Sequence, residues 1–427
     1  MTVDQVRRTF VLLTAMRWLP TGLTVPAIVL IGQARGLSLS QIGVITAIYG
    51  TTTLVLELPT GGLSDVIGRR PVLVAAGLLS VAASLVTALG TSFAVLACAA
   101  AIRGAARALD SGPLQSWFVE RTLAIDPEAS YRKGLSRASA GESIALAAGT
   151  LAAGGILAVT SLHASDTRLI ALSTPFLVAA VFGGVQVCLV AAWVKEPRRA
   201  TRLGLRSVVA DVPRTIAGGA RLAATHPTLR RLLVVTAAIG VALASIELLT
   251  PPHVAGIVGS DSKGASTYAV LATLGFVGSA IGASLAPAAT TLMRRPSRVP
   301  LVGALAGAAA LACTGAQAVG VLTVAYVAFY VLLGVGGPVI DELTHKSVTS
   351  RERATMLSVG SMALQGAGVL AALAVGPLAD HVSPGLALAA PATALALGSL
   401  ALVRLPAPSA LNATSAQPQG QALVSKS

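Results

Sequence analysis

Five charged residues lie inside long apolar stretches in the first half of the sequence: Arg17, Glu57, Arg103, Arg107 and Asp110. The last three have the spacing i, i+4, i+7, which places them on one face of a helix. A charge in an apolar environment is costly unless it is paired or functional. We therefore expect Glu57 and Asp110 to pair with the three arginines. Such a cluster either orders the structure or lets a carboxylate exchange an arginine contact for a proton.

Glu247 stands alone in an apolar stretch of the second half. A carboxylate facing a central cavity would bind a proton or a cation, whereas one near the end of its helix would be hydrated. Both interpretations remain open from the sequence.

Other chemistries find little support. The five histidines and three cysteines are scattered without a ligand-like spacing, so we expect no metal site. The chain has no phosphate-binding Walker loop and no grouping of a nucleophile with a base. We therefore expect neither an enzyme nor a cofactor.

The amino-acid composition indicates that membrane-spanning helices position these charges. Hydrophobic residues make up 54% of the 427 residues and charged residues only 11%, whereas soluble proteins average about 25% charged residues. Apolar stretches of about 20 residues, enough to cross a bilayer as helices, recur along the chain. The sequence predicts an all-α membrane protein with twelve transmembrane helices near 9–33, 41–63, 71–90, 92–115, 138–161, 168–194, 231–255, 265–290, 299–318, 321–346, 354–378 and 385–404.

The distribution of basic residues predicts the orientation. If the spans alternate, most of the 31 lysines and arginines fall on the side of the N-terminus, and only Arg35, Arg168 and Lys263 fall in loops on the other side. Cytoplasmic loops carry such an excess. We therefore expect both termini in the cytoplasm, and the net charge of +14 reflects topology rather than nucleic-acid binding.

The chain divides into two similar halves. Overlaying them aligns Pro26 with Pro251, Gly50 with Gly275 and Arg70 with Arg295, which favours two six-helix repeats with a substrate site between them. The expected organisation is an N-terminal half at 1–194, an amphipathic cytoplasmic linker at 195–230, a C-terminal half at 231–404 and a disordered cytoplasmic tail at 405–427.

The sequence GGLSDVIGRRPVLV begins at Gly61, at the predicted junction of the second and third helices. Its notable residues are Gly62, Asp65, Gly68, Arg69 and Arg70. Glycine permits close approach and a tight turn, and a carboxylate at this position can meet a helix N-terminus or an arginine.

These residues resemble the signature loop of the major facilitator superfamily. The resemblance implies a twelve-helix transporter fold in which Asp65, Arg69 and Arg70 form a cytoplasmic gate between the halves. We expect Asp341 and Glu342 to form a second gate with Arg351 or Arg353.

The phrases LELPTGGLSD from Leu56, SGPLQSW from Ser111 and SRERATMLS from Ser350 resemble bacterial macrolide-type and tetracycline-type drug efflux proteins. This implies a proton-coupled antiporter of the cell inner membrane that exports small amphipathic or drug-like compounds, as in multidrug resistance. The fifth predicted helix lacks the G-P-x-x-G-G motif usual in proton antiporters of the family.

An importer or facilitator of a sugar or organic acid is the alternative, and a membrane sensor is a less favoured third possibility. The expected partners are a small-molecule substrate, protons and the lipid bilayer, with the chain acting as a monomer.

Overall fold

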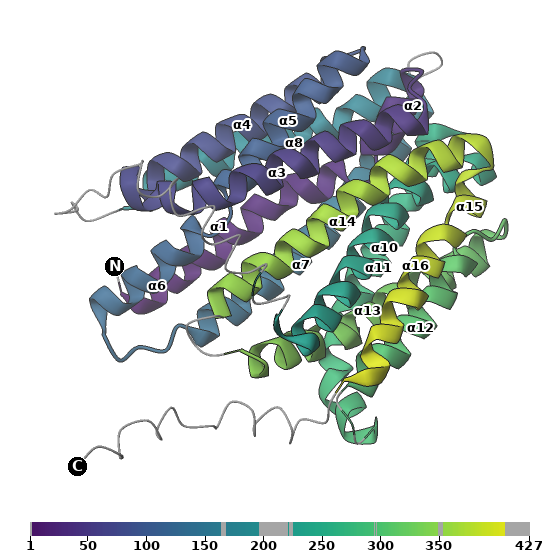
Figure 1. Cartoon of the computed structure of the whole chain (residues 1–427). Helices are drawn as coiled ribbons and strands as arrows, with labels where there is room; N and C mark the ends of the chain where they lie inside the picture. Colours follow the sequence, from purple (N-terminus) through teal and green to yellow (C-terminus); the bar gives the residue numbers. More distant parts are fainter. Residues whose placement is uncertain are drawn as a thin grey trace.

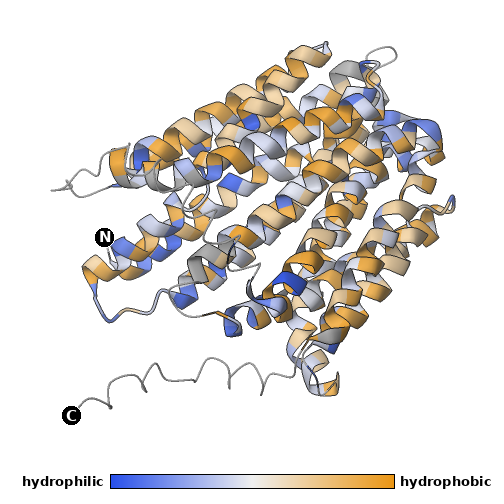
Figure 2. Cartoon of the chain, in the orientation of Figure 1, coloured by the Kyte–Doolittle hydropathy of each residue, from blue (hydrophilic) through white to orange (hydrophobic). Residues whose placement is uncertain are grey.

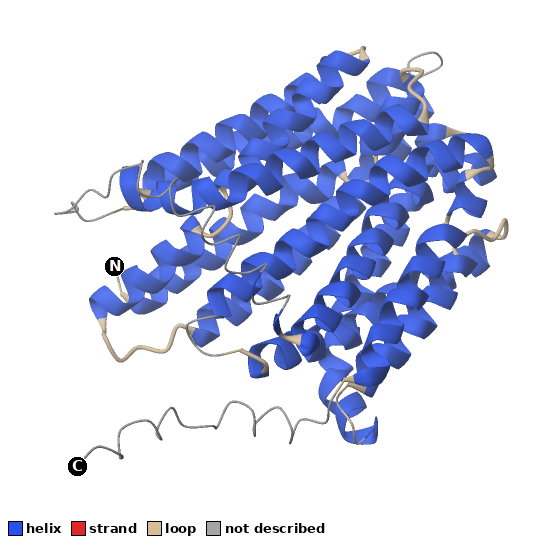
Figure 3. Ribbon diagram, in the orientation of Figure 1, coloured by secondary structure: helices blue, strands red, loops and turns tan. Residues whose placement is uncertain are grey.

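The computed structural model describes residues 2–163, 168–195, 221, 225–293, 295, 297–348 and 353–405. Its regular structure is helical throughout these ranges, with no strand (Figure 3). The predicted all-α fold is therefore confirmed. Most of the predicted linker at 195–230, and all of the tail at 405–427 except residue 405, lie outside the described residues, so the predicted division into halves, linker and tail stays a prediction.

The described residues of the first half form eight helices, and the breaks between them follow from proline and glycine. A break beside Pro26 separates the first two helices, which the sequence predicted as one span. Gly68, at φ +102°, separates the third helix from the fourth, and Gly112, at φ +96°, precedes Pro113 at the start of the sixth. The helices are α1 Val3–Thr24, α2 Ile28–Ala34, α3 Leu39–Ile67, α4 Arg69–Leu89, α5 Phe93–Leu109, α6 Pro113–Ile125, α7 Arg132–His163 and α8 Arg168–Trp193.

The second half has longer unbroken helices. Its elements are α10 Pro227–Val258, α11 Asp261–Met293, α12 Arg298–Cys313, α13 Val319–Lys346, α14 Arg353–His381, α15 Pro384–Ala387, α16 Ala389–Ser399 and a 3-10 helix Leu400–Arg404. Within the described part of the chain, ten helical segments are long and apolar enough to cross a membrane, and α12 is a shorter apolar helix. The chain is thus a multi-pass membrane protein, while the count of twelve spans is not confirmed.

Large apolar side chains face outward along the bundle. Leu292, Leu89 and Val324 are each more than two-thirds exposed, and Figure 2 shows apolar residues along the length of most helices. In water such a surface would aggregate. In a bilayer the same side chains contact lipid. An apolar outer surface is therefore what helices that span a membrane need.

The halves meet mainly through two pairs of described helices. Helix α3 packs against α14, and α7 packs against α11 (Figure 1). The first pair approaches closely at Gly43, where an added Cβ would lie 2.3 Å from the carbonyl oxygen of Ala372. Glycine at this position lets the two backbones meet directly.

The apolar cores differ between the two ends of the bundle. At the end that contains the N-terminus, Phe10, Trp117 and Phe118 form a core within the first half, while Leu232 and Leu343 belong to a separate core within the second half. At the opposite end the cores are shared between halves. Val29, Leu39 and Ile42 pack with Leu248, Ala372 and Val375, and Leu30 and Leu157 pack with Ala265. The halves are therefore packed together at the opposite end and separate near the N-terminus.

Candidate functional site

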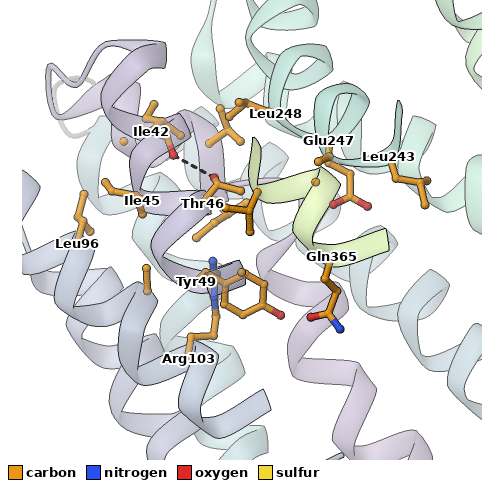
Figure 4. Close-up of a pocket in the computed structure, with 18 of the residues that line it drawn as sticks. Ile42, Ile45, Thr46, Tyr49, Leu96, Arg103, Leu243, Glu247, Leu248 and Gln365 are labelled. Carbon is orange, nitrogen blue, oxygen red and sulfur yellow. Dashed lines mark hydrogen bonds between the residues drawn. The ribbon is translucent and has the colours of Figure 1, made fainter. Parts of the chain in front are cut away.

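A central cavity of about 320 Å³ lies between the halves (Figure 4). Its walls come from α2, α3, α4 and α5 of the first half and from α10 and α14 of the second. Most of its lining is apolar and includes Ile42, Ile45, Leu96, Leu243 and Leu248. Its polar positions include Thr46, Thr87, Tyr49, Arg103, Glu247 and Gln365. A second cavity of about 260 Å³ shares Tyr49, Arg103 and Glu247 with the first and extends along α1 and α5.

The first half carries a charged cluster at the edge of this second cavity. Arg17 of α1 forms an ion pair with Asp110, directly after α5. The guanidinium groups of Arg17 and Arg107 lie 5.3 and 5.1 Å from the ring centroid of Trp18. Glu142 of α7 lies close enough to interact electrostatically with both arginines. The structure thus places two arginines over one indole ring and two carboxylates within electrostatic reach of these arginines.

Arg103 lies one helical turn before Arg107 but is not part of this cluster. Its guanidinium lies 4.8 Å from the ring centroid of Tyr49. Within the described ranges it makes no ion pair. On the facing wall, Glu247 of α10 is also without an ion pair in the described part of the chain, and its side chain is exposed to the cavity. Figure 4 shows the two side chains on different helices, with Tyr49 and Gln365 between them.

Among the described residues, Glu57 forms no ion pair with Arg17, Arg103 or Arg107, so this part of the sequence-based expectation was wrong. Its Oε1 accepts a hydrogen bond from the Ser111 hydroxyl at 3.2 Å, and its Oε2 accepts one from Gln365 Nε2 at 2.9 Å. Gln365 also contacts the Ser361 hydroxyl at 2.8 Å. The bond from Gln365 joins α14 to α3 and so crosses between the halves. The one sequence signal for this bond is the presence of a polar residue, Gln365, within the apolar stretch that forms α14.

The predicted gate loop lies between α3 and α4. Gly62 and Asp65 are in α3, but the contacts of Gly62 and of the Asp65 side chain lie outside the described part of the structure. Gly68 makes the turn, and Arg70 is exposed. Arg69 is buried and forms an ion pair with Glu120 of α6, a partner that the sequence analysis did not identify. The loop's role as a gate is not tested by these contacts.

The predicted second gate is only partly described. Asp341 and Glu342 lie on exposed turns of α13, and Glu342 pairs with Lys346 one turn later. Arg351 and the side chain of Arg353 fall outside the described part of the chain. A contact between these groups therefore stays a prediction.

The end opposite the N-terminus has polar contacts that the sequence analysis missed. The Asp380 carboxylate of α14 accepts hydrogen bonds from the backbone amides of Leu39 and Ser40 at 2.9 and 2.8 Å. These amides open α3, so a carboxylate of one half caps a helix of the other. Nearer the middle of the bundle, the Thr150 and Thr273 hydroxyls meet at 2.7 Å between α7 and α11. The contacts of Asp380 reinforce the packing of the end opposite the N-terminus.

No group of three or more metal-ligating side chains occurs within the described ranges.

Comparison with known proteins agrees with this architecture. Residues 10–341 match the family model of the Major Facilitator Superfamily. A 107-residue segment is 35% identical to the Inner membrane transport protein YajR of Escherichia coli (strain K12), a match that spans 24% of each chain, so the chain aligns with only about a quarter of that relative's length.

The fold resembles solved transporters at low sequence identity. The nucleoside transporter NupG aligns with a TM-score of 0.73 at 12% identity, over 94% of this chain and 100% of that one. A bacterial homolog of the human lysosomal transporter Spinster, in an inward-facing and unoccupied conformation, aligns with a TM-score of 0.69 at 18% identity, over 97% and 95%. The family match covers most of the sequence and the fold match nearly all of it. The chain belongs to the Major Facilitator Superfamily and is a membrane transporter rather than an enzyme.

Proposed function

We propose that the protein is a proton-coupled secondary transporter that exports small amphipathic compounds by alternating access. The observation that carries this proposal is the central cavity, which combines an apolar lining with the carboxylate of Glu247, unpaired among the described residues. An apolar wall binds the greasy part of a compound, and a carboxylate in that setting binds either a proton or a basic group.

The distribution of the cores supports alternating access. The halves share apolar packing at the end opposite the N-terminus and have separate cores at the N-terminal end. With the basic loops placed in the cytoplasm, the separated end faces inward. A compound would enter from the cytoplasm and leave after the shared end opens.

Two carboxylates are candidates for proton coupling. Glu57 bonds to Gln365 across the halves, so a proton on Glu57 would weaken an interaction that holds α3 to α14. Glu247 faces the cavity, so a proton and a bound basic group would compete for it. Competition of this kind couples proton entry to release of the compound.

The remaining features of the proposal concern location and gating. The basic loops and the partial likeness to an inner membrane transport protein support placement in the cell inner membrane, with both termini cytoplasmic. By resemblance to the family, Asp65, Arg69 and Arg70 form the cytoplasmic gate. The organisation into halves at 1–194 and 231–404, joined by a linker at 195–230, belongs to the same proposal.

Inverted membrane vesicles with a pH-sensitive dye test the function. After an inward proton gradient is established, addition of ethidium or a panel of other amphipathic compounds should release protons from vesicles with the wild-type protein. Glu247→Gln should abolish the release without lowering the amount of protein in the membrane. If no compound releases protons while whole cells accumulate a metabolite, the exporter proposal is wrong and the importer is favoured.

A further inference from the structure

Within the described part of the chain, two charges of opposite sign face the central cavity without an ion-pair partner. Arg17 and Arg107 are balanced by Asp110 and Glu142. The charges that remain at the cavity walls are Arg103 on α5 and Glu247 on α10. They come from different halves.

The contact between Arg103 and Tyr49 orients the guanidinium. The central carbon of this planar group lies over the tyrosine ring, 4.8 Å from its centroid, and the group carries five N–H donors in its plane. No described residue accepts a hydrogen bond from these donors. They suit a planar anionic group, because a guanidinium matches a carboxylate with two parallel hydrogen bonds.

Glu247 presents the complementary feature on the facing wall. Its carboxylate has four lone-pair positions, and none of the hydrogen bonds found within the described residues reaches it. Most of the remaining lining is apolar and includes Ile42, Ile45 and Leu243. An occupant that neutralised only one of the charges would leave the other unpaired in a region of low dielectric, at a cost.

We propose that the cavity selects amphipathic zwitterions, with an anionic group bound by Arg103 and a basic nitrogen bound by Glu247. The two charges of the substrate lie at opposite ends of an apolar body, because the protein groups lie on opposite walls. This proposal rests on the exporter function above and adds the substrate class. A zwitterion also bridges the halves, so it favours states in which they close around it.

The test uses norfloxacin, a fluorescent compound with a carboxylate at one end and a basic nitrogen at the other. Its ethyl ester lacks the anionic group, and its N-acetyl derivative lacks the basic group. Binding of each compound to the purified full-length protein in detergent at neutral pH is followed by fluorescence anisotropy. Norfloxacin should bind about tenfold more tightly than either derivative, because each derivative lacks one of the two charge-assisted hydrogen-bonding groups.

The variants assign each charge to its partner. Arg103→Gln should remove the preference for norfloxacin over the ethyl ester but keep the preference over the N-acetyl derivative. Glu247→Gln should remove the preference for norfloxacin over the N-acetyl derivative but keep the preference over the ethyl ester. Arg103→Lys should retain part of the preference over the ethyl ester that Arg103→Gln loses. Gel filtration and circular dichroism check that each variant is folded.

Three results would overturn the proposal: equal binding of all three compounds, no binding of norfloxacin by folded wild-type protein, or an equal loss of affinity for all three compounds in each variant. These results are distinct from failure of the exporter function. If ethidium releases protons but norfloxacin does not bind, the exporter stands and the zwitterion proposal falls. If binding discriminates as predicted but no compound releases protons, the proton coupling falls instead.

Discussion

The hydrogen bond from Gln365 to Glu57 offers a direct test of how a proton would alter the contact between the halves. Replacement of Glu57 with glutamine keeps the size of the side chain and removes its charge. The bond measures 2.9 Å between Gln365 Nε2 and Glu57 Oε2. The second bond of Glu57, to Ser111, stays within the first half and does not hold α3 to α14.

The expected magnitude follows from the change in the acceptor. A hydrogen bond to a charged group contributes about 1.5–3 kcal/mol and a neutral one about 0.5–1.5 kcal/mol. The loss across the halves is therefore roughly 1 kcal/mol, about fivefold in the population of states in which α3 and α14 separate. Gln365→Leu removes the donor and should shift the population in the same direction.

The assay combines transport with a distance measurement. The three native cysteines are first replaced, because all are exposed. Spin labels are then placed at exposed Ile125 of α6 and Lys346 of α13, at the end where the cores are separate. Glu57→Gln should shift the distribution of distances between the labels and abolish gradient-driven transport, with normal expression and gel filtration.

The matched control is Glu128→Gln, the same substitution at an exposed loop residue. It should change neither transport nor the distances. Wild-type transport by Glu57→Gln would refute the assignment of Glu57 to proton coupling. An unchanged distance distribution would refute the role of its bond to Gln365.

Three further predictions concern packing. Asp380→Asn removes the negative charge of a side chain that accepts hydrogen bonds from two amides at the start of α3. The substitution should weaken the packing of the halves at the shared end by about 1 kcal/mol, which would be measured as faster labelling of a cysteine placed there. Unchanged labelling would contradict this. Gly43→Ala brings a methyl group against the Ala372 carbonyl and should cost about 1–3 kcal/mol at the same contact, measured by the same labelling. Phe118→Ala removes a ring stacked on Phe10, with the ring centroids 4.3 Å apart. It should lower the free energy of unfolding by about 3–5 kcal/mol, measured by thermal unfolding in detergent. A smaller loss than that caused by replacing an exposed leucine with alanine would contradict this packing.

Several features of the fold could be predicted from the sequence because they depend on local properties. The length of an apolar stretch and the glycine turn at Gly68 are read along the chain. Apolar stretches were sufficient for the membrane class and the all-α fold, and the residues around Gly68 carried the resemblance to the family. The breaks beside Pro26 and before Gly112 were not predicted, because proline and glycine occur inside other helices that continue unbroken, as at Pro59 in α3.

The pairing of charges was harder to predict. Arg17 and Asp110 meet, as the cost of burying a charge requires, but Glu57 binds Ser111 and Gln365 instead of an arginine. A sequence indicates that a buried charge needs a partner but does not indicate which polar residue lies within reach. Serine and glutamine satisfy a carboxylate without any charge that would mark them.

The sequence by itself determined that the chain crosses a membrane as helices, because a continuous apolar stretch of about 20 residues satisfies its backbone hydrogen bonds within a bilayer by forming a helix. It also contained the family's signature loop, because that motif is contiguous. Only the tertiary structure decided which end of the bundle is packed shut and which charges face the cavity. Arg103 and Glu247 are far apart in the chain, and their place on facing walls depends on how α5 and α10 pack, which no local pattern specifies.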